Sequence, residues 1–166
     1  QSILNQQTDF SMELIIGEDC STDGTRELAF DLQRRHPERI RLITSEQNVG
    51  GAQNLRRVES ACRGKYTAYC EGDDAWSDQA KLAKQVAFLE GRPDYVVVHS
   101  WCHRYFTAEQ RLARNSLTVS KDLDDASAYE DLLLGRRLMM TRTVVARRAE
   151  LQRVLETCPE CYDAKW

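Results

Sequence analysis

Short apolar runs alternate with longer helical patterns along the first hundred residues of the chain. Four of these runs have the length and the aliphatic, β-branched content of buried strands, and they cover residues 12–17, 40–45, 66–70 and 95–99. The segments between them repeat apolar residues at helical spacing, which predicts helices over residues 25–35, 51–63 and 79–90. Strands that alternate with helices form parallel sheets through right-handed crossovers. The pattern therefore predicts an α/β fold, with a mostly parallel, Rossmann-like sheet flanked by helices.

The last third of the chain has a less regular pattern. Residues 127–130 have the sequence of a capping box and predict a helix that runs toward Leu134. A further strand is predicted over residues 141–146 and a further helix over residues 149–156.

The predicted elements at both ends of the chain look incomplete. Residues 2–6 resemble the last turns of a helix that has no start signal, and no stop signal precedes Trp166. A chain of 166 residues can form one domain with a substantial core but not two ordinary domains. We therefore expect one domain over residues 1–166, truncated at both ends.

Charge and hydropathy exclude two classes of partner. The formal net charge is −3, with acidic and basic residues interspersed, whereas a general electrostatic grip on nucleic acid requires a basic domain. No apolar run approaches the roughly 20 residues of a membrane-spanning helix. We expect a protein that binds no nucleic acid.

The cysteines favour free thiols over a disulfide framework or a metal site. Four of the six cysteines lie within apolar or helical patterns, which predicts reduced, mostly buried thiols and a cytoplasmic location. Cys158 and Cys161 form a lone CxxC, and a zinc or redox site would need a second pair of ligands. Cys102 and His103 could complete such a set, but free thiols are the better explanation.

Three polar loops follow the first three predicted strands, over residues 18–25, 46–51 and 71–74. All three are rich in carboxylates, amides or glycines. Ligands of open parallel sheets bind beyond the carboxyl ends of the strands. We therefore expect the three loops to lie along one edge of the sheet and to form a binding site there.

The third loop has the composition of a site for a hard divalent cation. Glu71 and Asp73 are two residues apart, so on an extended backbone both carboxylates would point the same way, and Gly72 lets the backbone approach a ligand closely. Mg²⁺ and Mn²⁺ prefer such oxygen ligands, commonly one or two carboxylates together with phosphates and water. The alternative is that Asp73, Asp74 and Ser77 only cap the following helix.

The first two loops fit a nucleotide but also have simpler explanations. Residues 21–24 make a good turn and helix N-cap. Glu18 and Asp19 directly follow an apolar run, where an unmatched charge is costly, and such a carboxylate could accept hydrogen bonds from a nucleobase or ribose. In the second loop, Asn48 and Gly50 lead into a helix N-terminus that can attract phosphate.

The three loops together resemble the motifs of family 2 glycosyltransferases. Residues 15–25 resemble the nucleotide-binding stretch of that family, and Asn48-Val-Gly50 followed by Asn54 resembles its Asn-x-Gly segment. Residues 71–76 resemble the DxD region, and the helix after them carries Lys81 and Gln85 as the family does. The resemblance covers residues 2–100 strongly and the remaining residues loosely.

This resemblance implies a GT-A fold, a nucleotide-sugar donor that is most often a UDP-sugar, Mg²⁺ or Mn²⁺, and transfer with inversion. It places the following residues at the donor: Glu18, Asp19, Asp23, Asn48, Gly50, Asn54, Glu71 and Gly72. Within that set it implies that Glu18 contacts the base and that Asp19 and Asp23 shape the nucleotide pocket. Asp73 would coordinate the metal, with Glu71 near the ribose or the metal's water ligands.

The chain departs from the family pattern at several positions. Glu71 replaces the more usual Asp, and Gln53 stands where many members have Arg. The family's first strand is expected before Gln1. The family's general base follows the strand and helix that residues 141–156 resemble, which makes Asp163 the candidate within this chain.

The resemblance further implies a glycan or lipid-linked acceptor and a role in polysaccharide biosynthesis, with peripheral membrane association if the acceptor is lipid-linked. An exposed sheet edge could support a homo-oligomer. Three alternatives stay open: a nucleotide-binding module of this fold without turnover, a nucleotidyltransferase, and a structural α/β domain. A nucleotidyltransferase normally has a Gly-rich, basic phosphate loop, which is missing from these residues.

Overall fold

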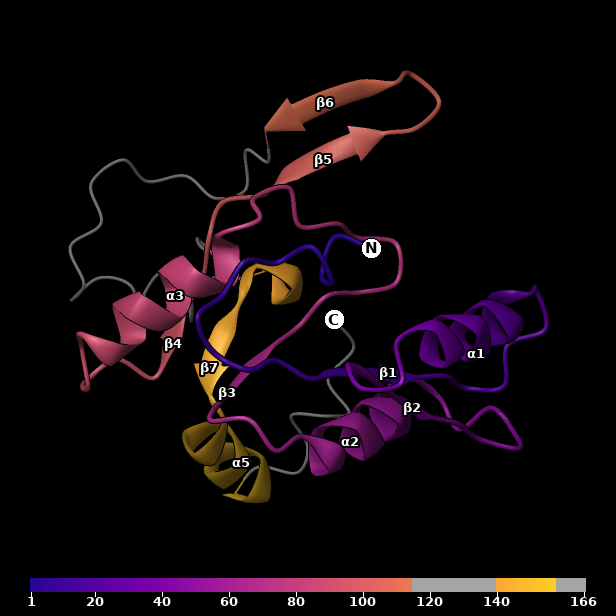
Figure 1. The fold of residues 1–166 in the computed structure, drawn as a ribbon, viewed down its shortest axis with the longest axis horizontal. Helices are drawn as coiled ribbons and strands as arrows, with labels where there is room; N and C mark the ends of the chain where they lie inside the picture. Colours follow the sequence, from indigo (N-terminus) through magenta and orange to yellow (C-terminus); the bar gives the residue numbers. More distant parts are fainter. Residues whose placement is uncertain (115–139, 158–166) are drawn as a thin grey trace.

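The computed structural model describes residues 1–114 and 140–157 (Figure 1). Its elements are, in chain order, β1 (Leu14–Gly17), α1 (Thr25–Arg35), β2 (Ile40–Ile43), α2 (Gly51–Ala61), β3 (Tyr66–Ala68), α3 (Lys81–Glu90), β4 (Val97–Val98), β5 (His103–Phe106), β6 (Arg111–Arg114), the 3-10 helix η1 (Thr141–Thr143), β7 (Val145–Arg147) and α5 (Arg148–Thr157). The predicted alternation of strands and helices over the first hundred residues is confirmed, although several elements are shorter than predicted. The helix predicted from the capping box at 127–130 lies outside the described residues.

The strands of the described residues form a parallel pair, a three-stranded sheet and a hairpin. β1 and β2 pair in parallel, from Leu14 opposite Ile40 to Gly17 opposite Ile43. β7 lies between β3 and β4 and is antiparallel to both. β3 and β4 therefore run parallel to each other, and β7 is the reversed strand of an otherwise parallel arrangement.

The segment predicted as one strand over residues 141–146 is divided in two. Val144 N donates to the Thr141 carbonyl at 3.0 Å, and the Thr143 hydroxyl donates to the Met140 carbonyl at 2.7 Å. These short-range bonds close a 3-10 turn, so the extended backbone begins only at Val145. The strand prediction was wrong for residues 141–143, since β-branched residues favour strands only where no local turn competes.

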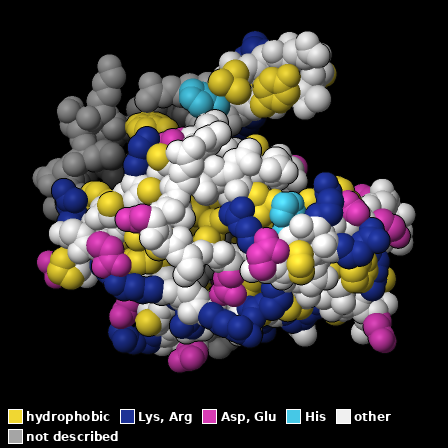
Figure 2. All heavy atoms as spheres, in the orientation of Figure 1, with side chains coloured by type: hydrophobic (Ala, Val, Ile, Leu, Met, Phe, Trp, Pro, Cys, Tyr) yellow, Lys and Arg dark blue, Asp and Glu magenta, His cyan; other side chains and the backbone are white. Residues whose placement is uncertain are grey.

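The β5–β6 hairpin was not predicted. It projects from the body of the domain (Figure 1), and Figure 2 shows hydrophobic side chains on its surface. Tyr105 and Leu112 pair across it and are 56% and 62% exposed. Because neither face of the hairpin is buried, its sequence lacks the apolar alternation that identifies a half-buried strand.

Helices α1 and α2 pack against the β1–β2 pair, and α3 packs against β4 and β7. The contact with α2 requires a glycine at the end of β1. A Cβ at Gly17 would lie 2.5 Å from Val58 Cγ2 and 2.9 Å from the Asn54 side chain. Asn54 Nδ2 also donates to the Gly17 carbonyl at 3.0 Å, so the helix is fixed directly beneath the first polar loop.

The main core lies between α3 and the three-stranded sheet. Leu89 and Val145 are 0% and 1% exposed, and together with Leu82 they form the centre of the cluster. The partly buried side chains packed around this centre are Phe10, Met12, Tyr66, Ala68, Trp76, Val86, Phe88, Tyr95 and Val98. The first twelve residues are therefore part of the core rather than a separate arm.

The first residues also anchor the start of α3. Gln6 Oε1 accepts a hydrogen bond from Leu82 N at 3.0 Å, and Gln6 Nε2 donates to the Asp78 carbonyl at 2.8 Å. Gln7 N donates to the Gln79 carbonyl at 2.8 Å. These bonds satisfy polar groups at a helix N-terminus that has no side-chain cap from its own N-cap residue, Ala80.

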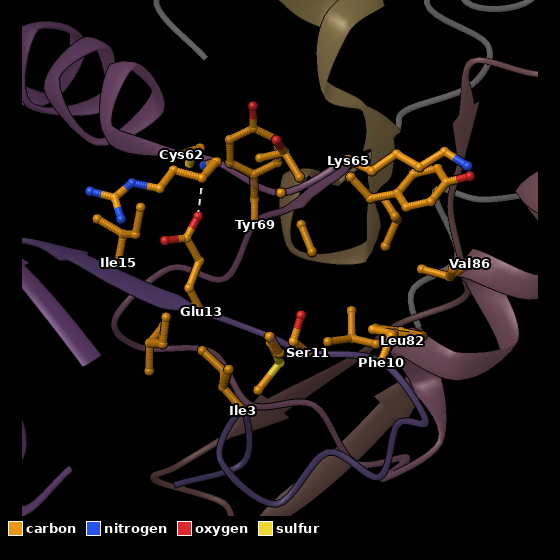
Figure 3. A pocket seen from close by; sticks show the side chains of 18 of the residues that line it. Ile3, Phe10, Ser11, Glu13, Ile15, Cys62, Lys65, Tyr69, Leu82 and Val86 are labelled. Atoms are coloured by element: carbon orange, nitrogen blue, oxygen red, sulfur yellow. Dashed lines mark hydrogen bonds between the residues drawn. The ribbon is translucent and has the colours of Figure 1, made fainter. Parts of the chain in front are cut away.

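A cavity of about 720 Å³ separates the β1–β2 pair from the three-stranded sheet (Figure 3). Ile15 of β1 and Leu82 and Val86 of α3 line it, together with residues 65–70 around β3. Glu13 lies at its edge and accepts a hydrogen bond from Arg63 N at 2.6 Å. The sheet is thus divided at this cavity, between β1 and β3.

None of the described helices is long and apolar enough to cross a membrane. The four described cysteines, Cys20, Cys62, Cys70 and Cys102, carry free thiols and are each half-buried rather than buried. Burial raises the pKa of the Cys62 and Cys70 thiols, which disfavours their thiolates. Cys158 and Cys161 lie outside the described residues.

Truncating the core should have a large effect on stability. We expect Leu89→Ala to lower the free energy of unfolding by about 2–5 kcal/mol, because it removes a fully buried side chain and leaves a cavity. Leu28→Ala is the matched control, since Leu28 is 56% exposed and its removal should cost no more than about 0.5 kcal/mol. Urea denaturation measures both, and equal losses would contradict the placement of the core at α3.

Candidate functional site

Asp19 joins the first polar loop to the second. Its Oδ1 accepts a hydrogen bond from Val49 N and its Oδ2 one from Gly50 N, both at 2.8 Å. Asn48 Nδ2 returns a bond to the Asp19 carbonyl at 3.1 Å. The parallel pairing of β1 with β2 brings these loops together, so the predicted convergence is confirmed for the first two of the three loops.

The same bonds occupy the N-terminus of α2. Gly50 precedes the helix with a positive φ of 85°, a conformation that favours glycine. Asp19 is thus the anion that this helix terminus holds in the structure. Asp19 bonds the two amides that precede the first helical residue, Gly51, and phosphate binding at this helix stays a prediction.

Glu18 is buried, with 3% of its surface exposed, and is held by the first loop itself. Cys20 has a left-handed backbone with φ of 61°, and the chain then turns back so that Ser21 N donates to Glu18 Oε1 at 2.5 Å. Arg26 Nη1 lies 3.1 Å from Glu18 Oε2, in ion-pair contact. Burial raises the pKa of Glu18, but the hydrogen bonds from Ser21 and Cys20 and the Arg26 charge outweigh burial, so the net pKa lies below its usual value.

Asp23 stands at the exposed end of the first loop. Its Oδ1 accepts a hydrogen bond from Thr25 N at 3.1 Å, which lowers the pKa of Asp23 and caps the start of α1. Gly24 follows with φ of 91°. The expected turn is therefore present, and the N-cap residue Gly24 has no side chain to cap the helix, so Asp23 before it bonds the first helical amide while its carboxylate stays in solvent.

Arg57 is a basic residue of this site that the sequence analysis missed. Its Nη1 lies 4.0 Å from Asp19 Oδ1, and it lines an open hollow of about 600 Å³ beside residues 44–49. Its Nη2 is buried and has no hydrogen-bond partner among the described residues. Arg57 lies one helical turn beyond Gln53, so the i, i+4 spacing was the signal that could have identified it.

In the third loop, Glu71 and Asp74 are held from a distant part of the chain. The Thr141 hydroxyl donates a hydrogen bond to Glu71 Oε1. Arg142 Nη1 donates to both oxygens of Asp74, at 3.0 and 2.9 Å. Sequence analysis gave no sign of these partners, because the two segments are 68 and 70 residues apart.

The carboxylates of Glu71 and Asp74 also interact with each other. Burial raises the pKa of Asp74, and the neighbouring Glu71 raises it further, against the opposing effect of Arg142. Burial acts on Glu71 in the same sense, but the hydrogen bonds from Thr141 and Asp74 outweigh it and lower the pKa of Glu71. The pKa of Asp74 is thus raised and that of Glu71 is lowered, so Asp74 is the first of the two carboxylates to take up a proton as the pH falls.

Asp73 differs from its neighbours. It is exposed, and its carboxylate has no hydrogen bond or ion pair with the described residues. A Cβ at Gly72 would meet nothing within 4 Å, so packing alone does not require a glycine there. Within the described ranges, no group of three or more His, Cys, Asp and Glu residues could hold a metal ion alone.

This donor set fits Mg²⁺ or Mn²⁺ that is shared with a phosphate ligand. Magnesium sites commonly use one or two carboxylates, with water and substrate phosphates as the other ligands. Asp73 supplies an uncommitted carboxylate, and Glu71 lies two residues away in the same loop. Asp163, the candidate general base, lies outside the described residues.

The helix-cap explanation of the third loop does not agree with the structure. α3 begins at Lys81 rather than at residue 79, and its N-cap residue is Ala80. The acid that bonds the start of the helix is Asp78, whose Oδ1 accepts from Ala80 N at 2.9 Å. Asp73 and Asp74 therefore lie too far from α3 to cap it.

The fold and the site together define an α/β domain of the GT-A type, with carboxylate-rich loops after its strands. Residues 1–151 match the family model described as glycosyl transferase family 2. The chain belongs to this family.

Individual relatives agree with the family assignment. An uncharacterised protein of Mycobacterium tuberculosis (strain H37Rv) is 37% identical over 147 residues, which make up 86% of this chain and 40% of that protein. TuaG of Bacillus subtilis, provisionally named as a teichuronic acid biosynthesis glycosyltransferase, is 31% identical over 123 residues, 73% of this chain and 45% of TuaG. The chain thus spans less than half the length of these relatives.

A solved structure has the same fold. It is a mannosyltransferase from Pyrobaculum calidifontis, PcManGT, in complex with GDP-Man and Mn²⁺. The TM-score is 0.62 at 18% identity, and the match covers 92% of this chain and 40% of PcManGT. At this identity the likeness establishes the fold alone.

Removing the Asp19 charge should loosen the link between the first two loops. In Asp19→Asn, one amide oxygen cannot accept both N–H groups as the two carboxylate oxygens do, so we expect a loss of about 1–3 kcal/mol in the free energy of unfolding. Amide hydrogen exchange at Val49 and Gly50 should accelerate. Asp31→Asn is the control, because Asp31 pairs only with exposed arginines of α1, and its loss should not exceed about 0.5 kcal/mol; unchanged exchange in Asp19→Asn would contradict the link.

Lys81 should give the domain a stability gain at alkaline pH. It is 8% exposed, and burial lowers its pKa to about 8 from 10.5. Between these values the unfolded chain binds more protons than the folded one, so stability should rise with pH, by up to about 3 kcal/mol across the interval. The measurement is the difference in unfolding free energy between wild type and Lys81→Met from pH 7 to 10.5, with the exposed Lys84→Met as control; a pH-independent difference would contradict the assignment.

Proposed function

We propose that the chain is the donor-binding domain of an inverting glycosyltransferase that takes a nucleotide-diphosphate sugar together with Mg²⁺ or Mn²⁺. The observation that carries this proposal is the contrast among the acids. Hydrogen bonds within the protein hold Asp19 and Asp74. Glu18 is held by Ser21 N and the Arg26 ion pair, with no hydrogen bond to its buried Oε2 from the described residues. The carboxylate of Asp73 has no partner among the described residues. An uncommitted carboxylate at the end of a strand is where a metal-bound diphosphate would be held.

The residues of the first two loops would shape the nucleotide pocket. Glu18 and Asp19 fix the backbone of residues 18–21 and 48–50, and Asp23 stands at the exposed rim. In this proposal Glu18 and Asp23 lie on the base and ribose side, while Asn48, Gly50 and Asn54 hold the loop and helix beneath the donor. Arg57 adds a positive charge to the same side of the site.

The third loop would hold the diphosphate through the metal. Asp73 supplies a ligand, Gly72 leaves room for the phosphates, and Glu71 orients water ligands or the ribose. When bound, the metal would neutralise charge on the departing diphosphate as a Lewis acid does. The general base would be a carboxylate that accepts the acceptor hydroxyl proton, with Asp163 as the candidate.

Two similar proteins, PcManGT and TuaG, support this proposal. PcManGT was solved with GDP-Man and Mn²⁺, a donor and metal of the proposed classes. TuaG is named for a polysaccharide pathway, which agrees with a glycan or lipid-linked acceptor and a role in polysaccharide biosynthesis. The motif resemblance implies a UDP-sugar, whereas PcManGT was solved with GDP-Man, so both nucleotides are tested.

We also propose a cytoplasmic site of action, with attachment to the inner face of the membrane when the acceptor is lipid-linked. The four free thiols of the described residues are consistent with a reducing compartment. A homo-oligomer would pair an open edge strand of one of the described sheets with a second copy of the chain.

Calorimetric titration of UDP and of GDP, each with and without Mn²⁺, tests the proposal directly. We expect one of the two nucleotides to bind with a requirement for Mn²⁺. Asp73→Asn should weaken that binding at least about tenfold, or about 1.4 kcal/mol, because it removes a charged metal ligand. Asp94→Asn is the matched control, since Asp94 is also exposed but precedes β4, at the opposite end of a strand.

Two results would contradict the proposal. Binding that is equally strong without Mn²⁺, or in Asp73→Asn, would show that the third loop holds no metal. If neither nucleotide binds, the assignment of a donor site to these loops is contradicted. Metal-dependent binding without sugar transfer would favour the alternative of a nucleotide-binding module without turnover.

A further inference from the structure

Residues of η1 contact residues 71–76, which we call the acidic loop. Thr141 donates its hydroxyl to Glu71, Arg142 binds both oxygens of Asp74, and the Arg142 carbonyl accepts the indole N–H of Trp76 at 2.9 Å. Three consecutive contacts therefore fall along residues 71–76, which end at Trp76. The Arg142–Asp74 pair is largely shielded from water, with the two side chains 31% and 18% exposed.

This segment is itself fixed by backbone contacts. Gln85 Nε2 of α3 donates to the Thr143 carbonyl at 2.9 Å, and its Oε1 accepts from Lys81 Nζ at 2.6 Å. Lys81 Nζ in turn lies 4.4 Å from the centre of the Trp76 ring. The carbonyl groups of Arg142 and Thr143 thus hold η1 through contacts that do not involve the side chains of Thr141 and Arg142.

The acidic loop needs such support because its charges repel each other. The carboxylates of Glu71, Asp73 and Asp74 occur within four positions, and like charges this close repel each other. Arg142 engages both oxygens of Asp74 and so removes Asp74 from the set of available metal ligands. Thr141 fixes one oxygen of Glu71. Asp73 is left as the carboxylate of the loop without a protein contact among the described residues.

We propose that Thr141 and Arg142 are positioning residues that brace the acidic loop and select Asp73, rather than Asp74, as its metal ligand. Neither residue touches the metal or the donor in this proposal. They act through Glu71 and Asp74, and they determine how strongly the loop binds a divalent cation. The proposal rests on the proposed function for its metal, but the state of the loop can be measured without any ligand.

The direction of the change in Mn²⁺ affinity when the Arg142 charge is removed distinguishes a positioning role from a purely electrostatic one. Removing the Arg142 charge would strengthen the attraction of the loop for a cation if Coulomb energy alone decided the affinity. If Arg142 braces the loop, the same substitution leaves two unshielded carboxylates that repel, and the affinity should fall. We expect Arg142→Gln to weaken Mn²⁺ binding in the presence of UDP or GDP at least about fivefold, or about 1 kcal/mol.

Conservative variants serve as matched controls. Arg142→Lys keeps the charge but replaces the planar guanidinium, whose Nη1 contacts both Asp74 oxygens, with a compact ammonium on a different stem, so its affinity should lie between those of wild type and Arg142→Gln. Thr141→Val removes the hydroxyl donor and should weaken binding, whereas Thr141→Ser keeps the donor and should restore it. In a cycle with Asp74→Asn, the double variant Asp74→Asn/Arg142→Gln should bind no worse than Arg142→Gln alone, because both changes remove the same contact.

The ligand-free arm uses amide hydrogen exchange. Asp74 N donates to the Glu71 carbonyl at 3.1 Å, so this amide reports the order of the loop. We expect its exchange to accelerate in Arg142→Gln while the amides of α3 stay unchanged. Unchanged exchange of the Asp74 amide in Arg142→Gln, or tighter Mn²⁺ binding by that variant, would contradict the proposed positioning role of Arg142. If wild type binds no metal but the Asp74 amide still exchanges faster in Arg142→Gln, the positioning role of Arg142 is supported and the proposed function is contradicted instead.

Discussion

Acidic side chains at the border of the core need a positive partner, and this constraint organises the site. Glu18 is buried and is matched by backbone N–H groups and Arg26. Asp19 is matched by the N-terminus of α2, and Asp74 by Arg142. The matches of Asp19 and Asp74 join segments that are distant in sequence, whereas Glu18 is matched by residues close to it in the chain. All three acids therefore have partners within the protein. Among the described residues, the carboxylate of Asp73 has no hydrogen bond or ion pair, and it is the carboxylate that we propose as the ligand of a cation.

The same matches connect the binding loops to the fold. Asp19 ties the loop after β1 to the loop after β2, and Gly17 lets α2 approach closely enough for Asn54 to bond the strand. The third loop belongs to the other side of the cavity between β1 and β3 and is positioned by η1 and α3. The two parts of the candidate site are therefore supported independently, the first two loops through Asp19 and the third through η1 and α3.

Much of the fold could be predicted from sequence because it depends on local periodicity. The strand and helix pattern of residues 12–99 and the turn at residues 21–24 follow from apolar spacing and cap residues. Strand order could not be predicted in this way, since β7 lies between β3 and β4 only through long-range pairing. The exposed β5–β6 hairpin carries no core face and therefore no periodic signal.

The candidate site was predictable in its composition but not in its contacts. The three loops were identified because carboxylates and glycines follow apolar runs, and the motif resemblance added the division of roles. Nothing local to Asp74 indicates that Arg142 would bind it, or that Glu18 would be buried against Arg26. These contacts separate structural acids from available ones, and that distinction exists only in three dimensions.

The central claim is that Asp73 holds a divalent cation that is shared with a nucleotide diphosphate. The most direct test is diffraction at the manganese absorption edge from crystals grown with Mn²⁺ and either UDP or GDP. The account predicts one anomalous peak at ligand distance, about 2.0–2.2 Å, from a carboxylate oxygen of Asp73 and from a phosphate oxygen, with Asp74 still bound to Arg142. A peak bound by Asp74 instead, or a nucleotide bound at these loops with no metal beside Asp73, would contradict it.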